Sequence, residues 1–129
     1  MGVRFPSVSS TVVVTAAPGA AEAVIATTPP LNISLDFSQI IVIWYFVLFT
    51  GATTTSLIVL LRRGTTITGT LVNVSLGDGV AAGVNLRRSG VYVDTPGAVA
   101  GQQYSLTLTQ TGATGNGALN DVCLIAFSL

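Results

Sequence analysis

The sequence predicts an all-β protein, an antiparallel, jelly-roll-like β-sandwich of about eight strands. Glycine and proline recur along the whole chain, at the roughly 8–12-residue spacing that is typical of sandwiches and barrels. The segments between them are rich in Val, Ile, Thr and aromatic residues, which favour strands. No segment combines a helical apolar period with helix caps. With 129 residues, the chain has the length of one domain with its own core.

We expect an extended N-terminal arm over residues 1–15 and a sandwich domain over residues 16–129. Pro6 and the neighbouring serines favour extended backbone in the arm. The β-branched run Thr11–Thr15 is a first strand candidate. Its apolar part is shorter than the roughly 7–15 residues of a secretory signal.

Two strand candidates follow the arm. Glu22–Thr28 contains residues that favour a helix, but it is short and runs into Pro29 and Pro30, so we interpret it as a strand. Leu31–Phe37 alternates strictly between apolar and polar residues. This alternation predicts a strand with one buried face and one solvent-facing face.

The stretch Ile40–Leu61 contains 22 residues without a charge and is followed by Arg62 and Arg63. Its length suits a membrane-spanning helix of about 20 residues, and the basic pair suits a cytoplasmic flank. However, the segment Thr50–Ser56 consists of small, polar or β-branched residues at the place where a membrane helix is most apolar. We therefore favour two strands joined by a turn. A membrane span at 40–61 remains the alternative.

The first of these strands, Gln39–Thr50, is apolar on both faces, which is typical of a sandwich interior or a subunit interface. Alternation places Trp44 and Phe46 on one face and Tyr45 and Phe49 on the other. The residues expected in an oligomer interface or in the core are Ile41, Ile43, Trp44, Tyr45, Phe46, Phe49 and Phe127.

Two further strands are expected around a glycine. Thr53–Arg63 continues as a strand until Gly64 interrupts it, and Thr65–Ser75 alternates as the next strand. The segment Gly77–Gly79 has the Asp-Gly chemistry of a tight hairpin turn.

The C-terminal half contains three more strand candidates. Leu86–Asp94 is a strand that Ser89 and Gly90 interrupt, and Thr95–Gly97 is a turn. Gln103–Thr109 alternates cleanly and precedes a glycine-rich loop over residues 110–117. Leu119–Leu129 is the last and most apolar strand.

The composition limits the partners that this protein can have. It contains five Arg, no Lys, no His and five acidic residues, so its net charge is zero. Little repulsion keeps such copies apart, and we expect a surface that an oligomer, a shell or a membrane covers. Nucleic acid is not an expected partner, because phosphate binding needs a basic excess.

The arginines occur as two adjacent pairs. We expect them to be hairpin-end or interface residues, with ion pairs between subunits as one role. These residues are Arg62, Arg63, Arg87 and Arg88. Their candidate partners are Asp36, Asp78, Asp94 and Asp121.

The sequence offers no catalytic, cofactor-binding or metal-binding residues, so we do not expect an enzyme. Without His there is no imidazole base and no His-ligated metal. The single cysteine, Cys123, lies in an apolar run, where we expect a small buried side chain. No cofactor is expected.

Three segments resemble the small jelly-roll virion proteins of tailed phages and related viruses, of the capsid-decoration and head-fibre type. They are Leu57–Thr70, Tyr92–Asp94 and Ala100–Leu108. More distantly, the pattern is similar to trimeric jelly rolls of the tumour-necrosis-factor type. The resemblance covers roughly residues 20–129. The segment Ile40–Phe49 departs from it, because it is more apolar than an exposed decoration subunit needs.

The resemblance implies a homotrimer on the capsid surface, with aromatic strands facing the three-fold axis. It also implies attachment to the major capsid protein, which we expect through the N-terminal arm by strand addition, and a passage through the host cytoplasm during assembly. The expected function is a non-enzymatic viral structural protein. The alternative is a carbohydrate- or surface-binding β-sandwich module, for which Tyr92 and Tyr104 are the aromatic residues nearest to loops.

Overall fold

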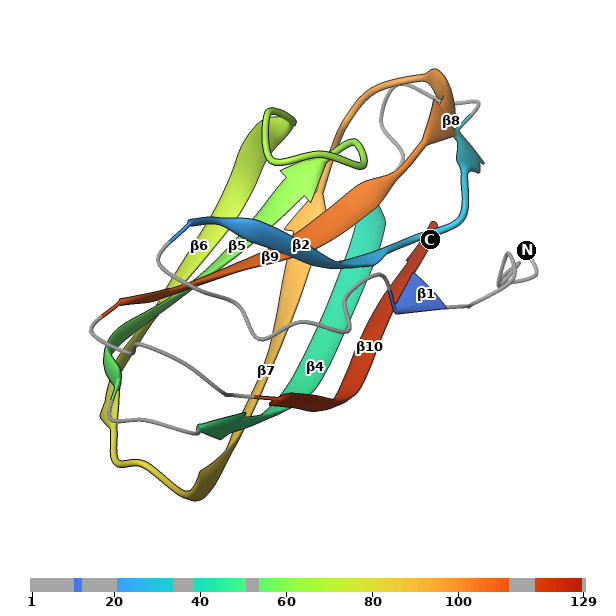
Figure 1. Ribbon diagram of the computed structural model, residues 1–129. Coiled ribbons are helices and arrows are strands. Elements are labelled where there is room, and N and C mark those ends of the chain that lie inside the picture. The colour runs from blue at the N-terminus through green and yellow to red at the C-terminus, as the bar shows by residue number, and fades with distance from the viewer. Residues whose placement is uncertain (1–10, 13–20, 34–38, 51–53, 112–117, 129) are drawn as a thin grey trace.

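The computed structural model describes residues 11–12, 21–33, 39–50, 54–111 and 118–128, and these residues form strands and turns without a helix (Figure 1). Ten strands lie in this part of the chain: β1 (Thr11–Val12), β2 (Ala23–Thr27), β3 (Leu31–Ile33), β4 (Ile40–Thr50), β5 (Thr54–Arg63), β6 (Thr70–Val80), β7 (Val84–Asp94), β8 (Val99–Gln102), β9 (Tyr104–Thr111) and β10 (Ala118–Ser128).

The strands form two main antiparallel sheets that pack as a sandwich, as the sequence predicts. The larger sheet has the order β1-β2-β9-β5-β6, and the smaller has the order β10-β4-β7. Strands β3 and β8 form a separate pair (Figure 1). The core lies between the two main sheets, because buried apolar side chains of both meet there, such as Phe46 and Leu124 from one and Leu57 and Leu106 from the other.

The uncharged stretch at residues 40–61 forms two strands in the structure, and the part described contains no helix that could cross a membrane. Strand β4 pairs with β10 and β7, whereas β5 pairs with β6 and β9. The two strands therefore do not form a hairpin with each other. The chain crosses from one sheet to the other between them, and each strand contributes one apolar face to the same core.

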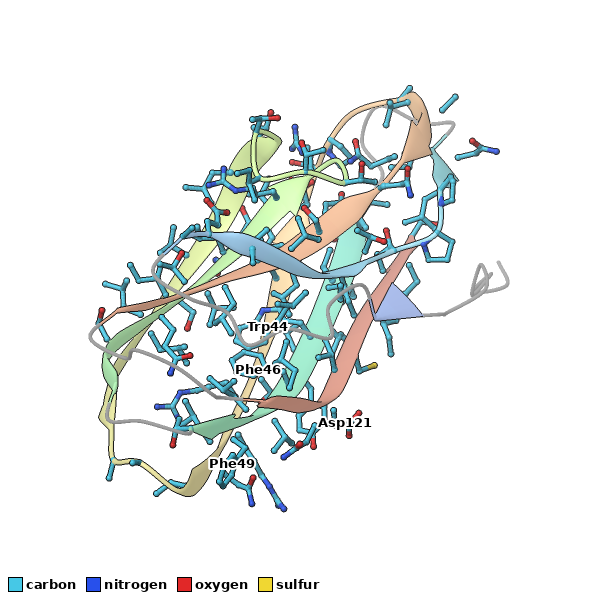
Figure 2. The ribbon with its side chains drawn as sticks, viewed as in Figure 1. Trp44, Phe46, Phe49 and Asp121 are labelled. Atoms are coloured by element: carbon cyan, nitrogen blue, oxygen red, sulfur yellow. The ribbon has the colours of Figure 1, made fainter. Side chains whose placement is uncertain are left out.

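Strand β4 separates its side chains as the alternation predicts. Trp44 and Phe46 point toward the larger sheet, whereas Phe49 points away from it (Figure 2). The Trp44 and Phe46 rings are stacked, with centroids 5.9 Å apart and an interplanar angle of 15°. Of the residues expected in core or interface, these two are core. The remaining five lie on the other face of the sheet: Ile41, Ile43, Tyr45, Phe49 and Phe127.

Two of the expected turns and interruptions are wrong. The segment Gly77–Gly79 lies inside β6, where Gly77 is paired with Leu57. The chain turns later, near Gly83, which has a φ of +75°. The Asp-Gly signal fails here because pairing with the long strand β5 continues past it.

The other error concerns β7, which continues through Ser89 and Gly90 without a break. The strand expected over Thr65–Ser75 also begins later, because residues 64–69 form the turn between β5 and β6. In that turn Gly64 has a φ of +102°. The expected break at Gly64 is confirmed.

Some expectations lie outside the described residues. Of the arm, only Thr11–Val12 is described, as a strand paired with β2. Of the alternating segment Leu31–Phe37, only β3 is described. Most of the loop expected over 110–117 is likewise outside.

Candidate functional site

The candidate site is the outer face of the three-stranded sheet, which is the side turned away from the core. Directly opposed residues of antiparallel strands share a face, so the register of β10, β4 and β7 sorts this outer face into rows. Read from β10 through β4 to β7, the first two rows are Phe127, Ile41 and Val93, then Ile125, Ile43 and Val91. All six are apolar, and Val91 has 67% of its surface exposed.

Polarity rises along the strands from these rows. The third row consists of Cys123, Tyr45 and Ser89, and the fourth of Asp121, Val47 and Arg87. Beyond them, Phe49 lies beside Asn85. The fourth row therefore has an acid at the β10 edge, a base at the β7 edge and an apolar residue between them.

A β-bulge in β10 determines which residues reach the outer face. Leu119 is opposite Leu48 and Asp121 is opposite Val47, so Asn120 is the extra residue. If Asn120 paired regularly with Val47, Asp121 would be opposite Phe46 and would face the core, because a one-residue slip exchanges the faces of a strand. The bulge thus places Asp121 outside (Figure 2), and the Asn120 side-chain amide donates to Asn85 Oδ1 at 3.3 Å.

Cys123 lies on the outer face as a half-buried free cysteine. We expected it to be buried, but the core-facing positions of β10 belong to Val122, Leu124 and Ala126. Because side chains alternate along a strand, Cys123 lies on the outer face.

A second apolar surface lies on the opposite side of the sandwich, on the outer face of β5 and β6. Leu71, Val74 and Leu76 are exposed there, and Leu76 has 76% of its surface exposed. Strand β6 is an edge of its sheet. This surface was not expected from the sequence, although the alternating apolar residues of β6 are its signal.

The network of Arg63, Asp94 and Tyr104 joins the two sheets. Arg63 of β5 donates to both carboxylate oxygens of Asp94 at the end of β7, at 2.8 and 2.6 Å. The Tyr104 hydroxyl of β9 donates to Asp94 Oδ2 at 2.7 Å. The Asp94 side chain is 5% exposed. Arg63 and Asp94 are among the arginines and aspartates expected to pair, and they form an ion pair within one chain.

This network perturbs the pKa values of its members. Burial raises the pKa of the Asp94 carboxyl, but the hydrogen bonds from Arg63 and Tyr104 outweigh it and leave this pKa below its usual range. Burial, followed by the hydrogen bond to Asp94, raises the pKa of the Tyr104 hydroxyl. Both groups therefore hold the protonation state that the network needs at neutral pH.

A second network lies on the outer face of the larger sheet. Arg62 donates to both Glu22 oxygens at 2.7 and 3.0 Å and to the Gly69 carbonyl at 3.0 Å. The Thr107 hydroxyl also donates to Glu22. The hydrogen bond from Arg62 is the largest cause of a lowered pKa for Glu22. Sequence reasoning did not identify Glu22 as a partner, because 40 residues separate it from Arg62.

The predicted ion pairs between subunits therefore concern the other arginine pair. Arg87 is exposed at the β7 edge of the outer face, and Arg88 faces the opposite side of the same strand. In a pairing between subunits, Arg87 is the arginine that the structure places on the candidate surface.

The described residues contain no pocket and no group of three or more His, Cys, Asp or Glu side chains suited to a metal ion. The aromatic residues considered for carbohydrate binding point inward: Tyr104 is fully buried, and Tyr92 packs against the core. The candidate site is therefore described as a surface of the sheet.

No protein-family model matches the sequence, and no curated protein matches it.

Proposed function

We propose that this chain is a non-enzymatic structural subunit of a virion, an oligomeric β-sandwich that decorates or reinforces a phage capsid. The observation that carries the proposal is the outer face of the three-stranded sheet, where six apolar side chains occupy two complete rows. A large exposed apolar patch on a soluble protein usually marks an interface. Its members belong to three paired strands of one sheet, so their arrangement is fixed by the strand register.

The second apolar surface, around Leu76, supports an assembly of more than two subunits. It lies on the opposite side of the sandwich, so one partner does not cover both surfaces. A subunit with apolar faces on both sides fits a shell, where each copy touches several neighbours.

The charge pattern also supports a role in assembly. Among the described residues, Arg62 and Arg63 form ion pairs with Glu22 and Asp94. These pairs leave few charges to keep separate copies apart in solution. Low repulsion suits a protein whose working state is an oligomer.

The trimer and the attachment to a major capsid protein through residues 1–15 belong to the same proposal. They rest on the resemblance given above, together with the position of β1 at the edge of the larger sheet, where strand addition would take place. The particle surface is the proposed location.

Co-sedimentation with purified virus particles tests the proposal. The full chain should sediment with the particles and show a β-rich far-ultraviolet circular dichroism spectrum. A variant that lacks residues 1–10 keeps β1 and should attach less while its oligomer remains intact. A full chain that stays in the supernatant at every ratio of protein to particles would refute the virion role.

A further inference from the structure

We infer that the partner of the outer face of the three-stranded sheet is a second copy of this chain, packed face to face about a two-fold axis that runs along β4. This inference rests on the proposed assembly role and replaces the trimer in it with a two-fold pair. It identifies one contact of the assembly and the orientation of the two copies.

The rows of the outer face determine the orientation. Rotation by 180° about an axis along β4 keeps the position along the strand and exchanges the two edges of the sheet. Each row therefore meets the same row of the partner copy, with β10 over β7. The first two rows place Ile, Val and Phe side chains against one another and remove them from water.

The fourth row supplies the charge complementarity. Under this rotation, Arg87 of one copy lies over Asp121 of the partner copy, and the reverse contact forms as well. Within the described chain, neither side chain takes part in an ion pair. The amides of Asn85 and Asn120 meet in the same way at the end of the face.

A two-fold axis across the strands gives a poorer match. It reverses the order of the rows, so that the apolar row of Ile41 lies near the polar end of the partner's face. Arg87 or Asp121 then meets apolar side chains, and burying an unpaired charge is costly. The arrangement of polar residues therefore selects the axis along β4.

The size of the face predicts a weak pair. Strand β4 has 11 residues, so the face is about 36 Å long and, with three strands, about 15 Å wide. The footprint is on the order of 500 Å² for each copy, at the low end for specific interfaces. Two aligned sheets that pack face to face cross at about 30°. At this angle the central strand β4 of one copy still lies over β4 of the other copy in the middle of the contact. We expect a concentration-dependent dimer that several contacts of a shell reinforce.

Charge reversal tests the orientation through sedimentation equilibrium over a concentration range. Asp121→Arg and Arg87→Asp should each weaken self-association by about tenfold or more, because like charges then meet on both sides of the axis. An equimolar mixture of the two variants should form a heterodimer. One copy then has arginine at both positions 87 and 121 and the other has aspartate at both, so opposite charges meet on both sides of the axis. The double variant R87D/D121R should pair with itself and not with the unchanged chain.

Matched controls separate this effect from folding. Thr65→Arg and Thr65→Asp add charges on the exposed β5–β6 turn, away from the outer face, and should leave the association constant unchanged. Each variant should keep its circular dichroism spectrum and melting temperature, because Arg87 and Asp121 are exposed. Wild-type association by either single variant, or a mixture that fails to recover, overturns the inference.

The native mass distinguishes this pair from the trimer. In a ring of three subunits made from two variants, at least one contact joins two copies of the same variant, so mixing restores the association of a trimer only in part. A native mass of three copies or of one copy overturns the two-fold pair. Particle co-sedimentation is measured separately. A chain that dimerises but does not sediment with particles supports this inference and overturns the virion role. A chain that sediments with particles but does not dimerise supports the virion role and overturns this inference.

Discussion

The Trp44 indole covers Gly90, its direct cross-strand partner in β7, so closely that a Cβ at residue 90 would lie 2.5 Å from two carbons of the ring. Gly90 is therefore a packing requirement of the core. A glycine inside a strand often marks such a close approach.

Gly90→Ala should lower the free energy of unfolding by about 2–3 kcal/mol, because the added methyl displaces the indole from its stack with Phe46. Denaturant unfolding followed by tryptophan fluorescence measures the change. Gly77→Ala is the matched control, since a Cβ there meets Leu57 at 3.4 Å. The control should be nearly neutral, and equal losses in both variants would contradict this explanation.

The Asp94 network should contribute strongly to stability. Asp94→Ala leaves the half-buried Arg63 guanidinium and the Tyr104 hydroxyl without their acceptor, and we expect a loss of about 3 kcal/mol. Tyr104→Phe removes only one hydrogen bond and should cost about 1–2 kcal/mol. Urea unfolding at pH 7 compares the two variants. A smaller loss for Asp94→Ala than for Tyr104→Phe would be inconsistent with Asp94 at the centre of the network.

Stability should fall in acid because of Asp94 and Glu22. Both carboxyls have a lower pKa in the folded chain than their usual values, so the folded state binds fewer protons than the unfolded state. Their contribution is present above the unfolded pKa values, about 3.9 for Asp and 4.3 for Glu, and is lost as the pH falls through the lower folded values. Unfolding free energies measured from pH 7 to pH 2 test this dependence, and Asp94→Asn should flatten the curve.

Two buried hydroxyls of β9 should respond oppositely to removal. Ser105 Oγ is fully buried and finds no hydrogen-bond partner among the described residues, whereas the Thr107 hydroxyl donates to Glu22. Ser105→Ala should be neutral or stabilising by up to about 1 kcal/mol, and Thr107→Val should cost about 1 kcal/mol. Thermal unfolding compares them. A clear loss for Ser105→Ala would show that its hydroxyl has a partner in solution.

The bulge at Asn120 gives a prediction about the outer face. Deleting Asn120 removes the extra residue, so that Leu119 and Asp121 become consecutive and keep their partners Leu48 and Val47. We therefore expect this variant to fold with Asp121 still on the outer face. Asn120→Ala keeps the extra residue and should fold, with only the weak bond to Asn85 lost. Circular dichroism distinguishes the outcomes. A deletion variant that unfolds or aggregates would contradict the assignment of Asn120 as the extra residue.

The strands could be predicted from the sequence because their alternation is local. The pattern of β4 assigned Trp44 and Phe46 to one face and Phe49 to the other. The partners of the strands could not be predicted, because β4 and β5 are adjacent in sequence but enter different sheets. Gly90 was expected to interrupt its strand, because its role depends on contact with Trp44 of another strand, which the sequence does not show.

The candidate site was predicted in part. The aromatic and aliphatic residues of β4 were expected at a surface or in the core, and alternation alone left both open. The rows that combine Ile43 with Val91 and Ile125 require the register of three strands. The bulge that turns Asp121 outward has no sequence signal comparable to a glycine or a proline, and Glu22 is too far along the chain from Arg62 for local reasoning.

The topology of β4 affects how the chain reaches its native state. Its two neighbours, β7 and β10, both follow it in sequence, and β10 is the last strand synthesised of those described. During translation β4 thus emerges with its hydrogen-bonding groups unpaired, and pairings between distant segments form slowly. A ribosome-bound chain that lacks β10 exposes an apolar edge, which makes truncated products prone to aggregate. Expression yield should therefore depend on chaperone supply and temperature more than on the measured stability of the finished protein.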